Sequence, residues 1–308
     1  MTADNGNPAT SEFQFTSSDG RRIACARWAN RAPLRGVVQI AHGMGEHVGR
    51  YHETIDALTL AGLIVYGNDH RGHGRTAPSP NSLGDFGAGG FDLLVEDMLQ
   101  LSRIARQAYP ETPFLLLGHS MGSFAAQQFV LDHSRDIDGL VLSGSGVLDG
   151  LARLAGSAPA IGDLLNFDFD PARTPFDWLS RDDAVVDAFL DDPLCFAELK
   201  PAAFASFLAA ASRLSDPVAL GRIRRGLPVY LFSGSEDPVG QHLEGAQALI
   251  ERYREAGLDD ISHDFYAGGR HEMLNEINRE EVRARLLRWI SRVFERSQVI
   301  TAVSSDAR

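Results

Sequence analysis

Ser120 is the residue whose surroundings point most directly to chemistry. It stands in the middle of residues 118–122, Gly-His-Ser-Met-Gly, which follow an apolar run at 114–117 and precede an amphipathic stretch at 123–133. A strand, a sharp turn and a helix in that order hold a serine in a strained conformation, with its hydroxyl group above the sheet. Glycine suits both ends of the turn because the strand and the helix pass too close there for a Cβ atom. The pattern therefore predicts a nucleophilic serine.

A serine hydroxyl is a poor nucleophile unless a base removes its proton, and a carboxylate must orient that base. With this type of turn, the three residues follow one another in the chain as Ser, then Asp or Glu, then His. Asp237 comes directly after a predicted strand at 229–232 and is the predicted acid. His271 lies between a predicted strand at 261–266 and the last predicted helix, so it is the predicted base.

Other acidic residues and histidines of the sequence are alternatives to Asp237 as the acid and to His271 as the base. Glu236 is the neighbouring competitor for the acid, and an aspartate before Pro238 is also a common turn residue. Among the ten histidines, His242 opens a predicted helix and His263 lies within a predicted strand. Neither histidine is in the loop where the chain order requires the base, so His271 is preferred.

The negatively charged oxygen of an acyl-transfer intermediate needs two hydrogen-bond donors. The backbone N–H of Met121, the residue after the serine, is the expected first donor. The second should come from the loop at 42–47, His-Gly-Met-Gly-Glu-His, which follows a predicted strand at 37–41. Glycines let such a loop turn its amides toward a site. Met44 is the predicted second donor.

Neither the histidines nor the cysteines indicate a metal. Five histidines lie near the predicted site without a spacing typical of metal ligands, namely His42, His47, His70, His73 and His119. The only two cysteines, Cys25 and Cys195, form neither a metal motif nor a disulfide framework. We therefore expect hydrogen bonding among loops, no metal and no cofactor.

Strand and helix patterns alternate along most of the chain, which predicts an α/β fold with a mostly parallel sheet covered on both faces. The alternation stops at about 147–226, where helix-like pieces rich in Ala, Leu, Phe and Asp are broken by prolines. We expect this stretch to be a helical lid inserted into a domain at 12–296. Some of its apolar side chains should line a substrate pocket. The polar ends, 1–11 and 297–308, are predicted to be disordered tails.

Composition narrows the classes of partner. The 308 residues are 44% hydrophobic and 23% charged, as in an ordinary globular domain, and carry a formal net charge of −12. This charge argues against a nucleic-acid partner. No apolar run approaches the roughly 18 residues of a membrane span, and the N-terminal residues have no apolar signal segment. The sequence predicts a cytoplasmic protein, leaves transient contact with lipid surfaces open, and says nothing of its oligomeric state.

Taken together, these segments resemble the α/β-hydrolase superfamily, and in particular its monoacylglycerol lipase and lysophospholipase branch with a serine aminopeptidase-type domain. The resemblance rests on residues 42–47 with Arg50-Tyr51, on 69–74 (Asp-His-Arg-Gly-His-Gly), on 118–122, and on 234–237 with 269–272. It implies the α/β-hydrolase fold, a triad of Ser120, Asp237 and His271, and oxyanion donors at Met44 and Met121. One departure is Ser123, where a second glycine often follows the turn.

The resemblance also implies the reaction: hydrolysis of carboxylic esters of small acylated alcohols, such as monoacylglycerols or lysophospholipids, through an acyl-enzyme. Two alternatives remain at this point. An amidase or aminopeptidase could use the same triad, and would need a carboxylate near the site to hold a substrate amine. A non-catalytic binding protein could share the fold, although such proteins typically lack a member of the triad.

Overall fold

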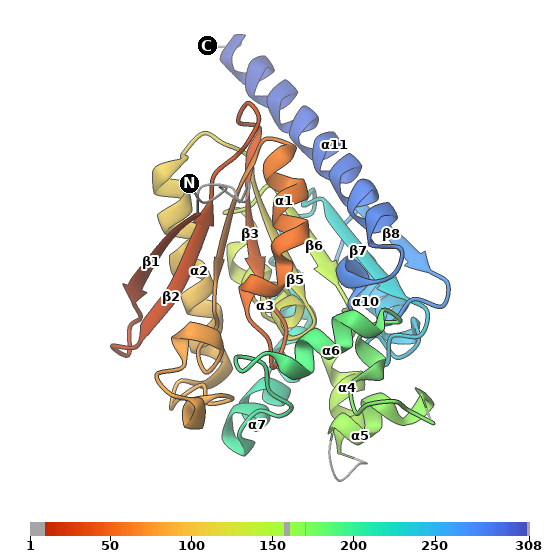
Figure 1. Cartoon of the computed structure of the whole chain (residues 1–308). Helices are drawn as coiled ribbons and strands as arrows, with labels where there is room; N and C mark the ends of the chain where they lie inside the picture. Colours follow the sequence, from red (N-terminus) through yellow and green to blue (C-terminus); the bar gives the residue numbers. More distant parts are fainter. Residues whose placement is uncertain (1–9, 157–160, 170, 307–308) are drawn as a thin grey trace.

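The computed structural model describes residues 10–156, 161–169 and 171–306. Eight strands form one sheet in the order β1-β2-β4-β3-β5-β6-β7-β8 (Figure 1). They are β1 (Thr10–Thr16), β2 (Arg22–Trp28), β3 (Gly36–Ala41), β4 (Leu63–Asn68), β5 (Phe114–His119), β6 (Gly139–Ser143), β7 (Val229–Gly234) and β8 (Ile261–Tyr266). Strand β2 is antiparallel to β1 and β4, and the other neighbouring pairs are parallel. The predicted fold class is confirmed.

Helices cover both faces of the sheet, which is why β3, β4, β5 and β7 are buried at every residue. Helices α1 (His52–Leu60) and α11 (Arg279–Asp306) pack on one face. Helices α2 (Gly90–Ala108), α3 (Met121–His133) and α10 (Glu244–Glu255) pack on the other. In α2 the apolar residues recur every three or four positions, so a single stripe of the helix meets the sheet.

Between β6 and β7 the described residues form helices and turns only, and we call residues 148–220 the helical insertion. It contains α4 (Leu148–Ala155), α5 (Ile161–Asn166), the 3₁₀ turns η4 (Phe167–Phe169) and η5 (Asp177–Leu179), α6 (Asp183–Asp191), α7 (Pro201–Ala209), α8 (Ala211–Leu214) and α9 (Pro217–Leu220). In Figure 1 it lies at the end of the sheet where the parallel strands finish. Residues 157–160 and 170 of the predicted insertion at 147–226 lie outside the described residues.

Three element boundaries differ from the sequence-based expectations. Strand β1 already begins at Thr10, and α11 continues to Asp306, through most of the segment predicted as a disordered tail from 297. Helix α10 begins at Glu244, after His242, which was predicted to open it, because Gln241, His242 and Leu243 all have positive φ angles, between 51° and 76°. Left-handed backbone cannot continue into a right-handed helix, and the apolar spacing of the sequence carries no signal of it.

No helix in the described part of the chain is both long enough and apolar enough to span a lipid bilayer.

A buried arginine ties the loop after β4 to two other parts of the chain. Arg71 is fully buried and donates to Asp97 on α2 (2.9 Å), to Asp19 (3.0 Å) and to Ser17 (3.0 Å) in the turn between β1 and β2. Burial raises the pKa of Asp97 by more than the neighbouring Arg71 lowers it. Burying these two charged groups therefore costs much free energy, and removing either Arg71 or Asp97 would leave the other as a buried charge without its partner.

Three buried histidines contact one another, with tilted or edge-on rings, in the loops that follow β3 and β4. The ring centroids of His42 and His70 are 4.2 Å apart, and those of His42 and His73 are 5.2 Å apart. Burial lowers the pKa of all three, that of His73 to about 3, so they are neutral at pH 7. Their ring nitrogens include none in a group of metal-ligand geometry among the described residues. The cluster packs the two loops together beneath the site.

Replacing Asp97 by alanine leaves Arg71 buried without its best partner. We expect Asp97→Ala to lower the free energy of unfolding by about 3–5 kcal/mol. The neighbouring Glu96→Ala is the matched control, since Glu96 is exposed, and it should change stability by less than ~0.5 kcal/mol. Urea unfolding followed by circular dichroism measures both, and equal stabilities for the two variants would contradict the argument.

The buried histidines also set how stability depends on pH. Their folded-state pKa values lie below the unfolded value of about 6.5, so the unfolded chain binds protons first as the pH falls. Stability is therefore complete above pH ~6.5 and decreases below it, by up to ~1.4 kcal/mol per pH unit for each histidine. Since the pKa of His271 is raised, its contribution to stability changes with pH in the opposite direction. Urea titrations at pH 7.5, 6.5 and 5.5 test this, and a flat profile would refute it.

Candidate active site

Ser120 occupies the turn between β5 and α3 in a left-handed conformation, with φ 52° and ψ −124°. The turn is held because Ser120 N–H donates to Ser143 O at 2.9 Å. A Cβ atom on Gly118 would lie 2.5 Å from Gly122 O, and one on Gly122 would lie 2.2 Å from Ala41 O. Both glycines are therefore required where strand and helix pass each other, which explains the small residues of the sequence pattern.

Ser123, the departure from the usual second glycine, has partners of its own. Its hydroxyl donates to Ser120 O at 2.6 Å and lies 2.7 Å from the hydroxyl of Ser145. The side chain of Gln127 donates in turn to Ser145 Oγ at 3.0 Å. This buried chain of hydrogen bonds supports the strained turn from the helix side. The sequence pattern alone assigned Ser123 no such role.

Asp237 and His271 meet in the loops after β7 and β8. His271 Nδ1–H donates to Asp237 Oδ1 at 2.9 Å, and Asp237 also accepts from Val239 N–H (3.0 Å) and Ser233 Oγ–H (3.1 Å). Burial alone raises the pKa of Asp237, but the charge of His271 and these hydrogen bonds outweigh it, so the pKa is lowered. For His271 the directions are reversed: burial alone lowers its pKa, but the negative charge of Asp237 outweighs burial, so the pKa is raised. Among the described residues no hydrogen bond involves Nε2 of His271, so this atom is available to take a proton.

The competing residues lie elsewhere. Glu236 is exposed beside Asp237. His242 pairs at the surface with Asp168 at 2.9 Å. His263 lies on β8, where its exposed ring contacts Phe265. None of these three lines the cavity that holds Ser120.

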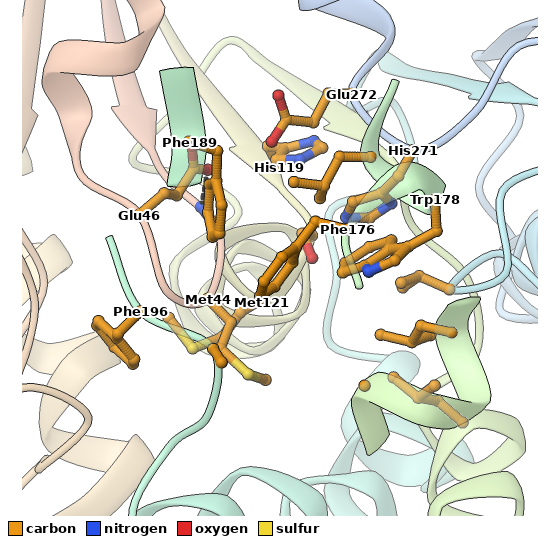
Figure 2. Close-up of a pocket in the computed structure, with 18 of the residues that line it drawn as sticks. Met44, Glu46, His119, Met121, Phe176, Trp178, Phe189, Phe196, His271 and Glu272 are labelled. Atoms are coloured by element: carbon orange, nitrogen blue, oxygen red, sulfur yellow. Dashed lines mark hydrogen bonds between the residues drawn. The ribbon is translucent and has the colours of Figure 1, made fainter. Parts of the chain in front are cut away.

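Ser120 and His271 line one cavity beneath the helical insertion (Figure 2). The ring of His271 lies between those of His119 and Trp178, with centroids 4.6 Å and 4.9 Å away. The hydrogen bonds within the described residues include none from Ser120 Oγ to His271. Such bonds often tighten only when substrate arrives. The structure thus brings the three predicted triad residues to one place, with the acid and the base in contact.

The two predicted donors also line this cavity. Met121 is the first residue of α3, so its N–H has no acceptor within the helix. Met44 follows Gly43, whose Cβ would lie 3.1 Å from the Cβ of Ser120, so the loop passes directly beside the serine. Both amides are therefore close to Ser120.

His42 fixes the orientation of the Met44 amide. His42 Nε2 accepts from the backbone N–H of His70 at 2.9 Å, so the proton of this neutral ring is on Nδ1 and is donated to Gly43 O at 2.8 Å. The carbonyl and the N–H of a trans peptide point in opposite directions. Since Gly43 O faces His42, the Met44 N–H points away from His42, as a donor to the cavity would require.

A buried ionic group links the loop of Met44 to the loop of His271. Glu46 accepts from Gly43 N–H (2.6 Å), from Tyr51 Oη–H (2.6 Å) and from Arg50 (2.8 Å). Arg50 also binds Glu272 with two hydrogen bonds of 2.6 Å and 2.9 Å. Burial alone raises the pKa of Glu46, but Arg50 and its other neighbours lower it to about 2. The segments that carry the family resemblance include these residues. They do not indicate that Arg50 meets Glu272, because the two are more than two hundred positions apart in the chain.

One group of side chains outside the cavity consists of residue types that can bind a metal ion. His47, Asp192 and Cys195 place one possible ligand atom each within 4.8 Å of one another. His47 Nδ1 accepts from Gly49 N–H at 3.2 Å, so Nε2 carries the proton that it donates to Asp192 at 2.9 Å. Burial raises the pKa of Cys195 to about 12. The hydrogen bond between His47 and Asp192 joins the insertion to the loop of Met44.

Comparison with known proteins agrees with this geometry. The family model described as serine aminopeptidase, S33 matches residues 32–278. Monoacylglycerol lipase of Mycolicibacterium smegmatis is 32% identical, over 91% of this chain and 96% of its own length. Human monoglyceride lipase is 30% identical, over 85% of this chain and 84% of its own.

Solved structures extend the comparison to the fold. A thermostable carboxyl esterase from Bacillus coagulans, solved with glycerol, superposes with a TM-score of 0.84 and 28% identity, covering 93% of this chain and 99% of its own. These relatives place the chain among carboxylic ester hydrolases, as the sequence predicted. The chain belongs to the serine aminopeptidase S33 family of the α/β-hydrolase superfamily, in the branch that contains the monoacylglycerol lipases.

Proposed function

We propose that the chain is a serine hydrolase that cleaves the ester bond of monoacylglycerol-like lipids through an acyl-enzyme. The observation that carries the proposal is the buried His271–Asp237 pair, which shares one cavity with the strained Ser120. Relatives named monoacylglycerol lipase support the substrate class.

In the proposed mechanism Ser120 Oγ attacks the ester carbonyl while His271 Nε2 takes its proton. The backbone N–H groups of Met44 and Met121 stabilise the oxyanion. His271 then gives the proton to the leaving alcohol, and Asp237 stabilises the imidazolium formed in between. A water molecule, deprotonated by His271, attacks the acyl-enzyme; as the acyl C–O bond breaks, His271 returns the proton to Ser120 Oγ and the fatty acid is released.

The cavity is apolar over most of its wall and polar at one side, as an acylated alcohol requires. The helical insertion acts as its cap and provides most of the apolar wall, including Leu151, Leu165, Phe176, Phe189, Phe196 and Phe204. Glu46, His119 and Glu272 lie at the polar side. The acyl chain would extend along the apolar wall, and the hydroxylated alcohol would face the polar side chains.

The same polar side chains argue against an aminopeptidase. A substrate ammonium group needs a carboxylate with free oxygen atoms. Arg50 binds both Glu46 and Glu272, and their remaining oxygen positions accept from Gly43 N–H, from Tyr51 and, on Glu272, from Asn275 at 2.9 Å. Because every oxygen of these two carboxylates already accepts a hydrogen bond, the geometry favours a neutral ester head group. A non-catalytic binding role would not explain why a histidine and an aspartate are paired in a buried position beside Ser120.

Removing the nucleophile should stop the reaction. We expect Ser120→Ala to lower kcat by a factor of about 10⁴ or more, because the other groups cannot form the acyl-enzyme. Rates on p-nitrophenyl esters from acetate to palmitate and on 1-monoacylglycerols measure this and the preferred chain length. Hydrolysis that persists at the wild-type rate in Ser120→Ala would refute the mechanism. Faster cleavage of matched amides than of esters would favour the aminopeptidase alternative.

Because His42 orients the Met44 amide, its loss should act on kcat. His42→Ala is expected to lower kcat by about 10²-fold with little change in KM for p-nitrophenyl acetate, as when one oxyanion donor is lost. The control is His73→Asn, which alters the same buried cluster without touching the Gly43 carbonyl. An equal loss of kcat in both variants would mean that general loosening of the cluster, and not the amide, is responsible.

A further inference from the structure

Trp178 belongs to the insertion but lies against the ring of the proposed base. Its indole is 4.9 Å from the His271 ring, tilted by 42°, and lines the cavity. Its Nε1 atom is buried and has no hydrogen-bond partner in the described structure. The position of the indole is therefore set by packing and by its own backbone, and not by a bond from the side chain.

The backbone around Trp178 is tied to the loop of His271. His271 N–H donates to Trp178 O at 3.3 Å, and Glu272 N–H donates to Leu179 O at 2.7 Å. The guanidinium of Arg270 donates to Asp177 O (2.5 Å) and Ser180 O (3.1 Å). The turn η5 and the loop of the base thus form one hydrogen-bonded unit, which keeps the indole on the imidazole.

We propose that Trp178 is a positioning residue for His271: its ring holds the imidazole against Asp237 and stabilises the imidazolium formed during acyl transfer. This rests on the proposed function, in which His271 is the base. A tryptophan ring within about 6 Å of a cation attracts it through the negative face of the π-system, more strongly where water is excluded. His119, on the other side, is neutral, because burial lowers its pKa to about 4.

Other titratable and charged groups lie around His271 and form the background of the test. They are Asp237 after β7, Glu272 on the same loop, Glu46 on the loop after β3, Arg50 between the two glutamates, and His119 at the end of β5. None of these is altered by a substitution at Trp178, so a changed titration of His271 reports the ring.

The test compares Trp178→Leu, which removes the aromatic face, with Trp178→Phe, which keeps a weaker one. Phe176→Leu is the matched control, since Phe176 lines the same cavity but its ring contacts Phe189. The substrate is p-nitrophenyl acetate, whose acyl group is too short to need the apolar wall. The acid limb of kcat/KM against pH reports protonation of the free base.

Without the ring the imidazolium is less stable, so the pKa of His271 falls and the acid limb moves to lower pH. We expect a shift of about half a unit to one unit in Trp178→Leu and a smaller shift in Trp178→Phe. In Trp178→Leu, kcat at pH 7 should fall about three- to tenfold with KM nearly unchanged. The limb of Phe176→Leu should stay at the wild-type position. An unshifted limb in Trp178→Leu, or an equal shift in Phe176→Leu, would overturn the proposal.

An NMR titration of the His271 ring in the Ser120→Ala background separates this proposal from the proposed function, because it needs no turnover. A lower pKa on adding Trp178→Leu supports the role of the ring, and an unchanged pKa rejects it. If wild-type protein did not hydrolyse esters at all, the proposed function would fail while this titration still decided the contact.

Discussion

The site depends on the close passage of β5 and α3 at Ser120. A strained serine can persist only if its surroundings leave it no other conformation. Here both neighbouring glycines face backbone at distances that exclude a Cβ atom, and the amide of Ser120 is bonded to β6. The two N–H groups predicted to bind the oxyanion belong to Met44, in the loop after β3, and to Met121, at the start of α3. The same close packing holds both segments beside Ser120. Moving the strand relative to the helix would therefore displace nucleophile and donors together.

Buried charge is the second constraint. The group of Glu46, Arg50 and Glu272 and the pair of Asp237 and His271 lie side by side in the protein, and each member is close to fully desolvated. Such charges cost free energy unless every one is paired, so the loops that carry them are held in register. The insertion joins this arrangement through the backbone of η5 and through the contact of Asp192 with His47.

The sequence predicted those features that follow from local pattern and chain order. The alternation of strands and helices, the turn at Ser120 and the loops that carry Asp237 and His271 all leave local signals, and the structure brings these residues together. The left-handed residues 241–243 leave no such signal, because their conformation is imposed by packing. The pairing of Arg50 with Glu272 and the contact of Trp178 with His271 join distant segments, so no local pattern reveals them.

Arg50 joins a residue near the beginning of the domain to one near its end, and this has a consequence for synthesis of the chain. The loop of Glu46 emerges from the ribosome long before Glu272. Until the loop of residues 269–272 folds, the pair of Glu46 and Arg50 lacks its second carboxylate, and Ser120 lacks the base that the proposed function assigns to His271. Under that proposal the triad is completed only once the C-terminal loop has been made, so a chain still on the ribosome carries no activated serine.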